Sequence, residues 1–346
     1  MALRGAELPG LAAMRHSAAR RSLLFCSLLI LILLLATISL LFGVKSVGAP
    51  DVFHALSGHV QTVAEAAAAK RIPRALLAML VGAALALSGA TLQAVTRNPL
   101  ADPGILGVTG GAAAAVIIGI AFFGISTQFG YMGAATIGGL GAAAFVYGVG
   151  SIGRDGPTPL KLALAGAASS AAFVSLASAV LLPRVDLMQR FEFWRVGGLG
   201  GANWASLATV GPVIAAGALV VALMARPMNS LALGDELAVG LGEHVNRNRL
   251  AAAAAAVVLA AAATAVAGPI GFVGLVVPHL CRLLIGPDHR WLLPFSAAFG
   301  AVLLLASDIV GRIIARPQEI EVGIITAMLG APFFIWIVRR HKVRAL

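Results

Sequence analysis

The feature of this sequence that most constrains its fold is a series of charge-poor apolar runs, most of them long enough to cross a lipid bilayer. A hydrocarbon core about 30 Å thick takes roughly 20 apolar residues in helical form. Runs of that length lie near residues 22–44, 73–95, 104–125, 130–150, 160–182, 202–224 and 249–267. Three shorter runs lie near residues 270–286, 291–309 and 321–338. We therefore predict an all-α membrane protein with ten transmembrane helices.

Composition favours a membrane protein over a soluble one. Hydrophobic residues make up 60% of the 346-residue chain and charged residues 11%, whereas a soluble domain carries roughly 25% charged residues. The net charge of +11 would also suit a nucleic-acid partner, but the basic residues lie between the apolar runs and form no single patch. Basic residues in such positions orient membrane helices, so we expect no nucleic-acid partner.

The chain divides into one large membrane domain and two short tails. The expected parts are an N-terminal tail (1–21), a ten-helix domain (22–340) and a C-terminal tail (341–346). Arg15, Arg20 and Arg21 before the first run would also suit a signal peptide. The run at 23–44 is longer than the apolar part of a typical signal peptide, so we expect it to be retained as the first membrane helix.

A Gly-Pro pair divides the longest uncharged stretch. No Asp, Glu, Lys or Arg occurs between Leu250 and Cys281, which is too long for one crossing. Proline removes a backbone donor and clashes with the preceding turn, so Gly268-Pro269 predicts two helices joined by a tight turn. The helix interiors are rich in Ala and Gly, which let helices approach closely in a membrane, and this predicts a tightly packed bundle.

The distribution of basic residues predicts the orientation of the chain. With ten crossings, sixteen of the 25 Lys and Arg residues fall on the side of both termini and nine on the other side. Positive charge is enriched on the cytoplasmic side of membrane proteins. We therefore expect both termini in the cytoplasm. The arginines left outside, among them Arg71, Arg74 and Arg312, stand out against this bias.

Motifs for catalysis or metal binding are not evident in the sequence. There is no HExxH, CxxC or GxSxG pattern, and Cys26 and Cys281 are isolated in apolar segments. The GxGxxG match at 148–153 lies at a membrane-helix end with no strand before it, so it does not predict a nucleotide site. We expect a transport subunit that is not an enzyme and that binds no metal.

Two sites within the membrane runs leave their roles open. His279 could bind a metal or haem or relay protons, but a hydrogen-bonded imidazole at a helix end is the simpler reading. Asp308 and Arg312 lie four residues apart, so they share a helix face and can pair. An ion-coupled transporter needs an ionisable group near the middle of the membrane. Asp308 is the deepest candidate, but the acidic residues lie in loops or near span ends, which disfavours such a transporter.

The longest cytoplasmic connection carries apolar residues that a simple linker would not need. It covers residues 226–249, and its centre, 231–242, reads as a short amphipathic helix interrupted by glycines. Exposed apolar residues of this kind predict a docking surface for another protein.

Several longer motifs resemble one known family. They are Arg71-Ile-Pro-Arg74, Asn98-Pro-Leu-Ala-Asp-Pro-Gly-Ile-Leu-Gly107, the 231–242 segment, Gly268-Pro-Ile-Gly-Phe-Val-Gly-Leu-Val-Val-Pro-His279 and Leu329-Gly-Ala-Pro-Phe333. Their order and the match over residues 20–340 resemble the iron-siderophore, haem and cobalamin permease subunits of type II ABC importers.

The resemblance implies a homodimer with ten helices per subunit, an inverted internal repeat and one central translocation pathway. The turns at 99–107 and 268–278 are expected on opposite membrane faces, as such a repeat predicts. It also implies a location in the bacterial inner membrane, two cytoplasmic ATPase subunits and a periplasmic binding protein. A Walker A motif needs a lysine after a glycine, and no lysine here follows one. We expect this chain to bind no cofactor, with ATP and Mg²⁺ on the partner ATPase.

The resemblance also implies roles for individual residues. Arg71, Arg74 and Arg312 match outward-facing arginines that receive glutamates of the binding protein. Asn98, Leu100 and Thr158 match a cytoplasmic gate, although the segment around Thr158 has fewer hydroxyl groups than the family pattern. The expected ATPase coupling residues are Leu231, Leu233, Gly234, Asp235, Glu236, Leu237, Gly240, Leu241 and Gly242.

The substrate is less defined than the architecture. The whole sequence looks closest to haem permeases, so haem is the expected substrate, with ferric siderophores and cobalamin as alternatives. The reading from a different class is an ion-coupled secondary transporter. Uptake driven by a proton gradient, without an ATPase, would distinguish that class.

Overall fold

The computed structural model of the chain describes residues 18–45, 47–104, 106–152, 159–184 and 196–340. All regular secondary structure in these ranges is helical. The helices are α2 (Ala18–Leu41), α3 (Ala49–Leu56), α4 (Val63–Thr96), α5 (Val108–Phe123), α6 (Gln128–Gly150), α7 (Pro159–Leu181), α9 (Trp204–Leu223), α10 (Ala225–Leu231), α11 (Asp235–Gly240), α12 (Val245–Ala267), α13 (Val273–Ile285), α14 (His289–Ile314) and α15 (Val322–Arg340).

The described part of the chain contains seven helices that are long and apolar enough to cross a membrane. They are α2, α4, α9, α12 and α14 with most of α6 and α7. Three shorter apolar helices are α5, α13 and the first part of α15. The prediction of an all-α, multi-pass membrane protein is confirmed, and the count of ten crossings stays a prediction.

Two helices are longer than the apolar runs that predicted them. The predicted span at 73–95 is the second part of α4, which begins ten residues earlier, at Val63. The Thr62 hydroxyl accepts from the Glu65 amide at 3.1 Å, and the Glu65 carboxylate accepts from the Thr62 amide at 2.7 Å. This capping box starts the helix in a charged segment that hydropathy does not register. Likewise α14 has 26 residues and is not a short span.

The break at Gly268 is confirmed, but the tight turn is wrong. α12 ends at Ala267, and residues 268–272 run without helical structure to α13. Gly268 has a φ of 68°, which glycine adopts without strain. Gly268 and Ile270 are buried, so this non-helical backbone is covered by protein, as membrane depth requires.

The two Gly/Pro-rich turns begin at opposite ends of the bundle and approach each other inside it. The first follows the end of α4 next to α10, and the second follows the end of α12 that lies away from α11. A Cβ on Gly274 would lie 3.0 Å from the Leu85 carbonyl and 3.1 Å from the Asp102 carboxylate. The second turn therefore runs from the end of α12 along α4, and close packing of Gly274 against α4 fixes this path. The placement of the two turns on opposite membrane faces stays a prediction.

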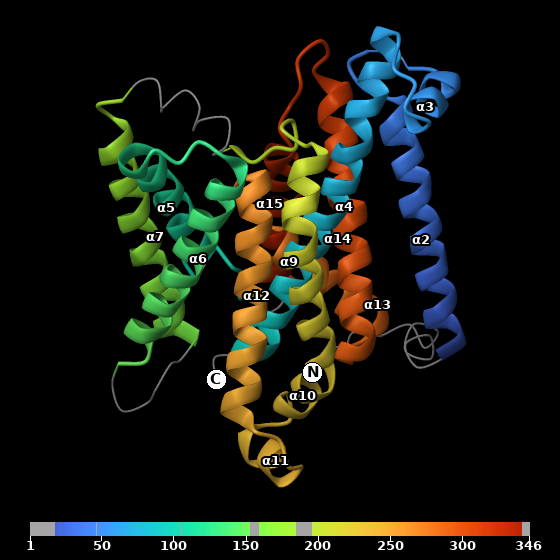
Figure 1. Cartoon of the computed structure of the whole chain (residues 1–346). Coiled ribbons are helices and arrows are strands. Elements are labelled where there is room, and N and C mark those ends of the chain that lie inside the picture. The colour runs from blue at the N-terminus through green and yellow to red at the C-terminus, as the bar shows by residue number, and fades with distance from the viewer. Residues whose placement is uncertain (1–17, 46, 105, 153–158, 185–195, 341–346) are drawn as a thin grey trace.

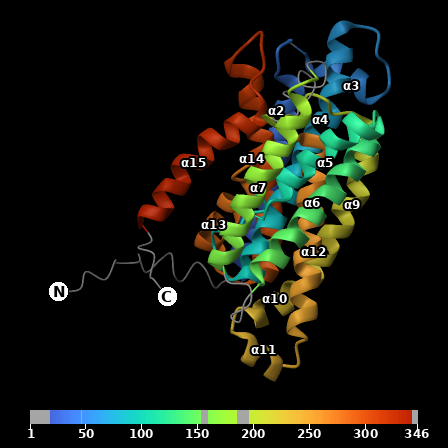
Figure 2. The same cartoon turned by 90° about the vertical axis from the view of Figure 1, so that its left-hand side faces the viewer.

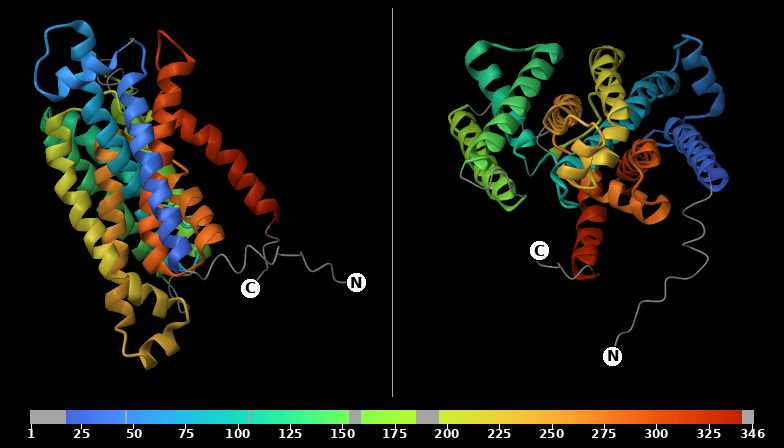
Figure 3. Two further views of the ribbon diagram at one scale, coloured as in Figure 1. Left: turned by 90° about the vertical axis from the view of Figure 1, so that its right-hand side faces the viewer. Right: turned by 90° about the horizontal axis from the view of Figure 1, so that it is seen from below.

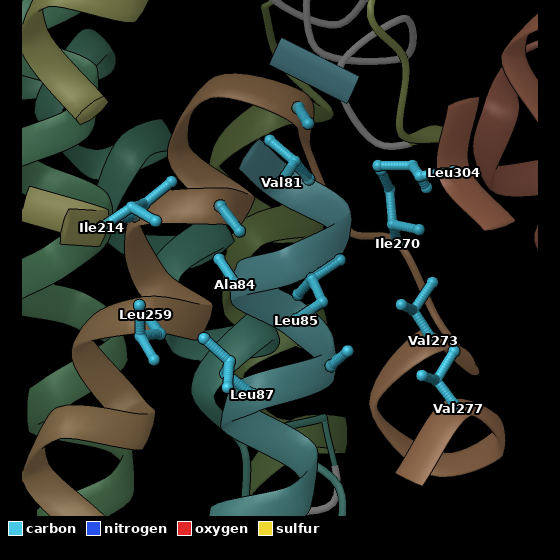
Figure 4. Packing of buried hydrophobic residues seen from close by; sticks show 14 of the residues in the cluster. Val81, Ala84, Leu85, Leu87, Ile214, Leu259, Ile270, Val273, Val277 and Leu304 are labelled. Atoms are coloured by element: carbon cyan, nitrogen blue, oxygen red, sulfur yellow. The ribbon is translucent and has the colours of Figure 1, made fainter. Parts of the chain in front are cut away.

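Helix α4 lies at the centre of the molecule and packs against α2, α9, α12, α13 and α14. Figure 4 shows its side chains Val81, Ala84, Leu85 and Leu87 between two groups of neighbours. Ile214 and Leu259 lie on one side, and Ile270, Val273, Val277 and Leu304 on the other. The buried cores of α4 and α12 contain many alanines, and small side chains allow this density of helices around one axis.

Glycines make the closest crossings in the bundle. A Cβ on Gly82 would lie 2.2 Å from the Gly300 carbonyl, and one on Gly89 would lie 1.9 Å from the Gly274 carbonyl. A Cβ on Gly138 would lie 2.4 Å from the Gly111 carbonyl. The first two contacts join α4 to α14 and α13, and the third joins α5 to α6. This is the tight packing that the small residues predicted.

The short helices mark the two ends of the bundle (Figure 1). α3 lies at one end, here called the α3 end, and α10 and α11 project from the other, here called the α11 end. α5, α6 and α7 form a group on one flank, and α15 slants away from the bundle (Figure 2). Viewed along the bundle, α2, α7 and α15 lie at its margin (Figure 3).

Candidate functional site

At the α3 end, two arginines and two acids form a chain of ion pairs. Arg74 of α4 contacts Asp308 of α14 with Nε at 2.9 Å and Nη2 at 2.8 Å. Its Nη1 contacts Glu319, in the loop after α14, at 2.7 Å. Arg312 pairs with the second Asp308 oxygen at 3.0 Å. Asp308 is 1% exposed and Arg312 2%, so the predicted pairing of these two residues is confirmed, and it extends to Arg74.

Arg71 and Arg312 also hold the end of α2. Arg312 Nη1 donates to the Ser39 carbonyl at 3.0 Å, and its Nη2 donates to the Ser39 hydroxyl at 2.6 Å. Arg71 donates to the carbonyls of Leu40 and Leu41 at 2.9 Å. The last carbonyls of a helix have no partner within it and carry partial negative charge. The two guanidinium groups therefore cap α2 and tie it to α4 and α14.

A cavity of about 560 Å³ opens beside these arginines. Five cations, Lys45, Lys70, Arg71, Arg74 and Arg312, line it, together with Glu319 and the segment at 200–204. Lys45 and Lys70 are exposed, whereas Arg71 and Arg312 are buried and Arg74 is 14% exposed. The three arginines predicted for docking thus lie together in a cationic recess, each already bonded within the chain. Their role in docking stays a prediction.

At the α11 end, the segment predicted for coupling folds into two short helices. α10 and α11 are separated by Gly234, whose φ of 114° suits glycine. Met228, Leu231 and Ala238 are buried beneath them. The coupling residues Leu233, Leu237 and Leu241 are each at least 60% exposed, and Asp235, Glu236, Gly240 and Gly242 are also on the surface. The predicted helix with exposed apolar residues is confirmed as two helices, and its partner stays a prediction.

One arginine connects this segment to α4. Arg97 is the C-cap residue of α4, and its Nε and Nη2 donate to the Leu231 carbonyl at 3.0 and 2.6 Å. Arg97 also pairs with Asp235, which a second arginine, Arg249 of α12, contacts at 3.0 Å. Burial alone would raise the pKa of Asp235, but Arg249 and Arg97 lower it below its ordinary value.

The two described gate residues follow Arg97 directly. The Asn98 side chain accepts from the Leu100 amide at 2.9 Å, which fixes a turn at the end of α4. Leu100 is 37% exposed. Thr158, the third predicted gate residue, lies outside the described residues. Asp102, in the same loop, accepts from the Gly104 amide at 2.8 Å, and burial raises the pKa of its carboxyl group.

The residues whose roles the sequence left open lie in different places. His279 of α13 stacks edge-on against Phe333 of α15, with ring centroids 6.5 Å apart. His279 thereby contacts α15, which slants away from the bundle. Asp308 belongs to the chain of ion pairs with Arg74 and Arg312. Among the described residues, no group of three or more His, Cys, Asp or Glu side chains could hold a metal ion.

Sequence reasoning missed two participants in these sites. Glu319 pairs with Arg74 across 245 positions of the chain, and Arg97 pairs with Asp235 across 138. Long-range pairing of this kind has no periodic signal in one sequence. The only local sign was the placement of Arg97 beside the Asn98-Pro motif.

Comparison with known proteins gives a consistent result. The sequence model of the FecCD transport family matches residues 29–340. The chain is 42% identical over 325 residues to the ferric enterobactin transport system permease protein FepD of Escherichia coli, covering 93% of this chain and 97% of that protein. It is 40% identical over 279 residues to the hemin transport system permease protein HmuU of Yersinia pestis, covering 79% and 82%.

A solved structure has the same arrangement of helices. It is described as an inward-facing conformation of a metal-chelate type ABC transporter, and it aligns with a TM-score of 0.79 and 32% sequence identity. The alignment covers 92% of this chain and 99% of that one.

Proposed function

This chain belongs to the FecCD transport family, and from that premise we propose that it is the membrane-spanning permease of an ATP-driven importer of iron chelates. The proposed assembly contains two copies of the chain around a central pathway, two cytoplasmic ATPase subunits and a periplasmic binding protein. Ten crossings with both termini in the cytoplasm would put the α3 end outside and the α11 end inside.

The observation that carries this proposal is the exposed apolar surface of α10 and α11. Leu233, Leu237 and Leu241 project from the α11 end, beyond the helices long enough to span a bilayer. Water is an unfavourable surrounding for such a patch, and exposed apolar patches mark interaction sites. An ATPase subunit seated there would supply the nucleotide hydrolysis for which this sequence has no Walker A lysine.

At the α3 end, we propose that the cationic recess receives carboxylates of the binding protein. Arginine suits this task because its planar fork binds a carboxylate bidentately. Arg74 is the most accessible of the three arginines, and its bond to Glu319 shows that a carboxylate fits there. We expect a carboxylate of the partner to compete with Glu319 for Arg74.

The substrate we propose is a ferric chelate, and haem remains the narrower prediction. Relatives of similar identity are named for ferric enterobactin and for hemin. Identity to this chain therefore does not favour haem over a siderophore. Specificity in such an assembly would reside mainly in the binding protein.

Reconstitution in liposomes tests the function. The permease is inserted with its ATPase subunits, the binding protein is added outside, and uptake of ⁵⁵Fe-labelled chelates is measured with ATP enclosed. We expect uptake that requires ATP, the ATPase and the binding protein. Uptake driven by a proton gradient with this chain alone would instead establish a secondary transporter.

A matched pair of substitutions tests docking. Arg74→Glu is expected to weaken binding of the binding protein by roughly tenfold or more, since it places like charges against each other, which costs more than about 1.4 kcal/mol. Asn203→Asp, which adds a negative charge on the rim of the same cavity, is expected to have a smaller effect. Equal effects would mean that only overall charge matters and that Arg74 receives no carboxylate.

A further inference from the structure

The strongest unassigned feature of the structure is a cluster of two arginines and one aspartate between the proposed coupling helices and the proposed gate. It consists of Arg97 at the end of α4, Asp235 at the start of α11 and Arg249 in the first turns of α12. Its members therefore join three elements.

Arg97 has an unusual backbone for its residue type. Its φ is 51° and its ψ 29°, in the left-handed region that a residue with a side chain rarely occupies. This conformation ends α4 and directs the chain into Asn98 and Leu100, the proposed gate. A residue held in such a conformation needs support from its surroundings, and here the side chain supplies it.

The supporting bonds all go to the coupling segment. The Arg97 guanidinium grips the Leu231 carbonyl, the last of α10, with two donors at 3.0 and 2.6 Å. The same group pairs with Asp235 at the first position of α11. Asp235 lies between Arg97 and Arg249, whose Nη2 is 3.0 Å away. Leu231 is 1% exposed, so α10 is packed firmly, and the two bonds to its carbonyl tie Arg97 to α10.

We propose that Arg97 and Asp235 form the link through which movement of α10 and α11 is transmitted to the gate at Asn98 and Leu100. This inference rests on the proposed function, because it takes α10 and α11 as the ATPase contact. A shift of α11 pulls on the Arg97 guanidinium, and Arg97 lies next to Asn98 in the chain. Arg249 steadies Asp235 from α12, so the cluster transmits a shift of α11 toward the end of α4.

The predicted signature is a loss of gate movement without loss of the ATPase. The full complex is reconstituted in nanodiscs with Cys26→Ala, Cys281→Ala and Leu100→Cys, and a spin label on the new thiol reports the gate. The spectrum of this label changes between the nucleotide-free and ATP-vanadate states if the gate moves. The size of that change in Arg97→Asn and in Asp235→Asn is compared with its size in the otherwise unsubstituted complex. Asparagine tolerates the left-handed backbone, so Arg97→Asn removes the guanidinium without adding strain.

We expect Arg97→Asn to retain ATPase subunits and ATP hydrolysis. In both variants the nucleotide-dependent change at the gate should fall by roughly threefold or more, as is typical of positions that modulate coupling between sites. Arg97→Lys should restore part of the change, because lysine keeps the charge but not the fork that grips Leu231. Arg290→Gln, which removes an exposed arginine at the same end of the bundle, is the control and should leave the change intact.

Two outcomes would overturn the inference, and they can be told apart. If both variants keep the full change at the gate, Arg97 and Asp235 do not transmit it, and the proposed function stands. If the unsubstituted complex neither binds ATPase subunits nor shows a nucleotide-dependent change, the proposed function fails and the inference fails with it.

Discussion

Asp308 shows how one buried carboxylate organises the α3 end of the molecule. It lies between Arg74 and Arg312, within 3.0 Å of both. Arg312 in turn binds the end of α2. Removing one partner from a buried ionic group leaves uncompensated charge, which is strongly destabilising.

We therefore predict that Asp308→Asn lowers the free energy of unfolding by about 3–5 kcal/mol. The matched control is Glu319→Gln, which breaks the more exposed pair with Arg74 and is expected to lower it by about 1 kcal/mol or less. Thermal unfolding in detergent, followed by circular dichroism, measures both. Similar losses in the two variants would mean that burial of Asp308 does not set its contribution.

Asp102 provides a prediction that depends on pH. Burial raises the pKa of its carboxyl group, so the folded state favours the protonated form. The stability gained by protonation is fully present below the unfolded pKa of about 3.9 and is lost as pH rises through the raised pKa of the folded state. As the pH rises toward 7 the folded chain therefore loses stability that protonation of Asp102 supplies at low pH.

Asp102→Asn is accordingly expected to raise the melting temperature at pH 7. The asparagine oxygen can still accept from the Gly104 amide, which is 2.8 Å from the present carboxylate. The advantage over the wild type should shrink as pH falls toward 4, because protonation of Asp102 then stabilises the wild type. A variant less stable than wild type at pH 7 would show that the ionised form is favoured in the folded chain.

At the scale of elements, apolar length predicted where helices lie better than where they begin. The run at 73–95 identified α4 but not its first ten residues, because Glu65, Lys70 and Arg71 interrupt the hydropathy. The Glu65 charge is satisfied by a capping box and the Arg71 charge by the end of α2, whereas Lys70 is exposed. α3 was not predicted, since eight residues are too few for a periodic signal.

The Gly-Pro break was predictable, but its path through the bundle was not. Proline and glycine signal the end of α12 locally. The segment after the break follows α4 because Gly89 and Gly274 allow close backbone contact, and a contact between residues so far apart in the chain has no local pattern.

That contact makes Gly89 a sensitive position. Gly89→Ala is predicted to destabilise the fold by about 1–3 kcal/mol, the usual range for overpacking, because its Cβ would lie 1.9 Å from the Gly274 carbonyl. Gly133→Ala in α6 is the control, since no atom lies within 4 Å of its added Cβ. Thermal unfolding of the two variants compares them. Equal stability would mean that α4 and α13 can separate at little cost.

At the scale of the whole molecule, the sequence motifs indicate the function more specifically than the geometry of a single chain does. The exposed leucines of α11 and the cationic recess beside Arg74 each indicate a partner, but neither identifies it. The family match extends over 29–340 and connects both surfaces to one kind of assembly. The ion pairs that join them to α4 became apparent only in the folded chain.

The orientation of the molecule can be tested with two cysteines at its opposite ends. His59, in the loop after α3, and Arg247, in the first turn of α12, are both exposed, and α3 and α11 mark opposite ends of the bundle (Figure 1). In a background with Cys26→Ala and Cys281→Ala, His59→Cys and Arg247→Cys are treated with a membrane-impermeant maleimide in spheroplasts. If both termini are cytoplasmic, His59→Cys reacts in intact spheroplasts and Arg247→Cys reacts only after permeabilisation. The reverse pattern would put the arginine recess in the cytoplasm, where no periplasmic protein could dock. It would also leave α10 and α11 without access to an ATPase, so the proposed function depends on this result.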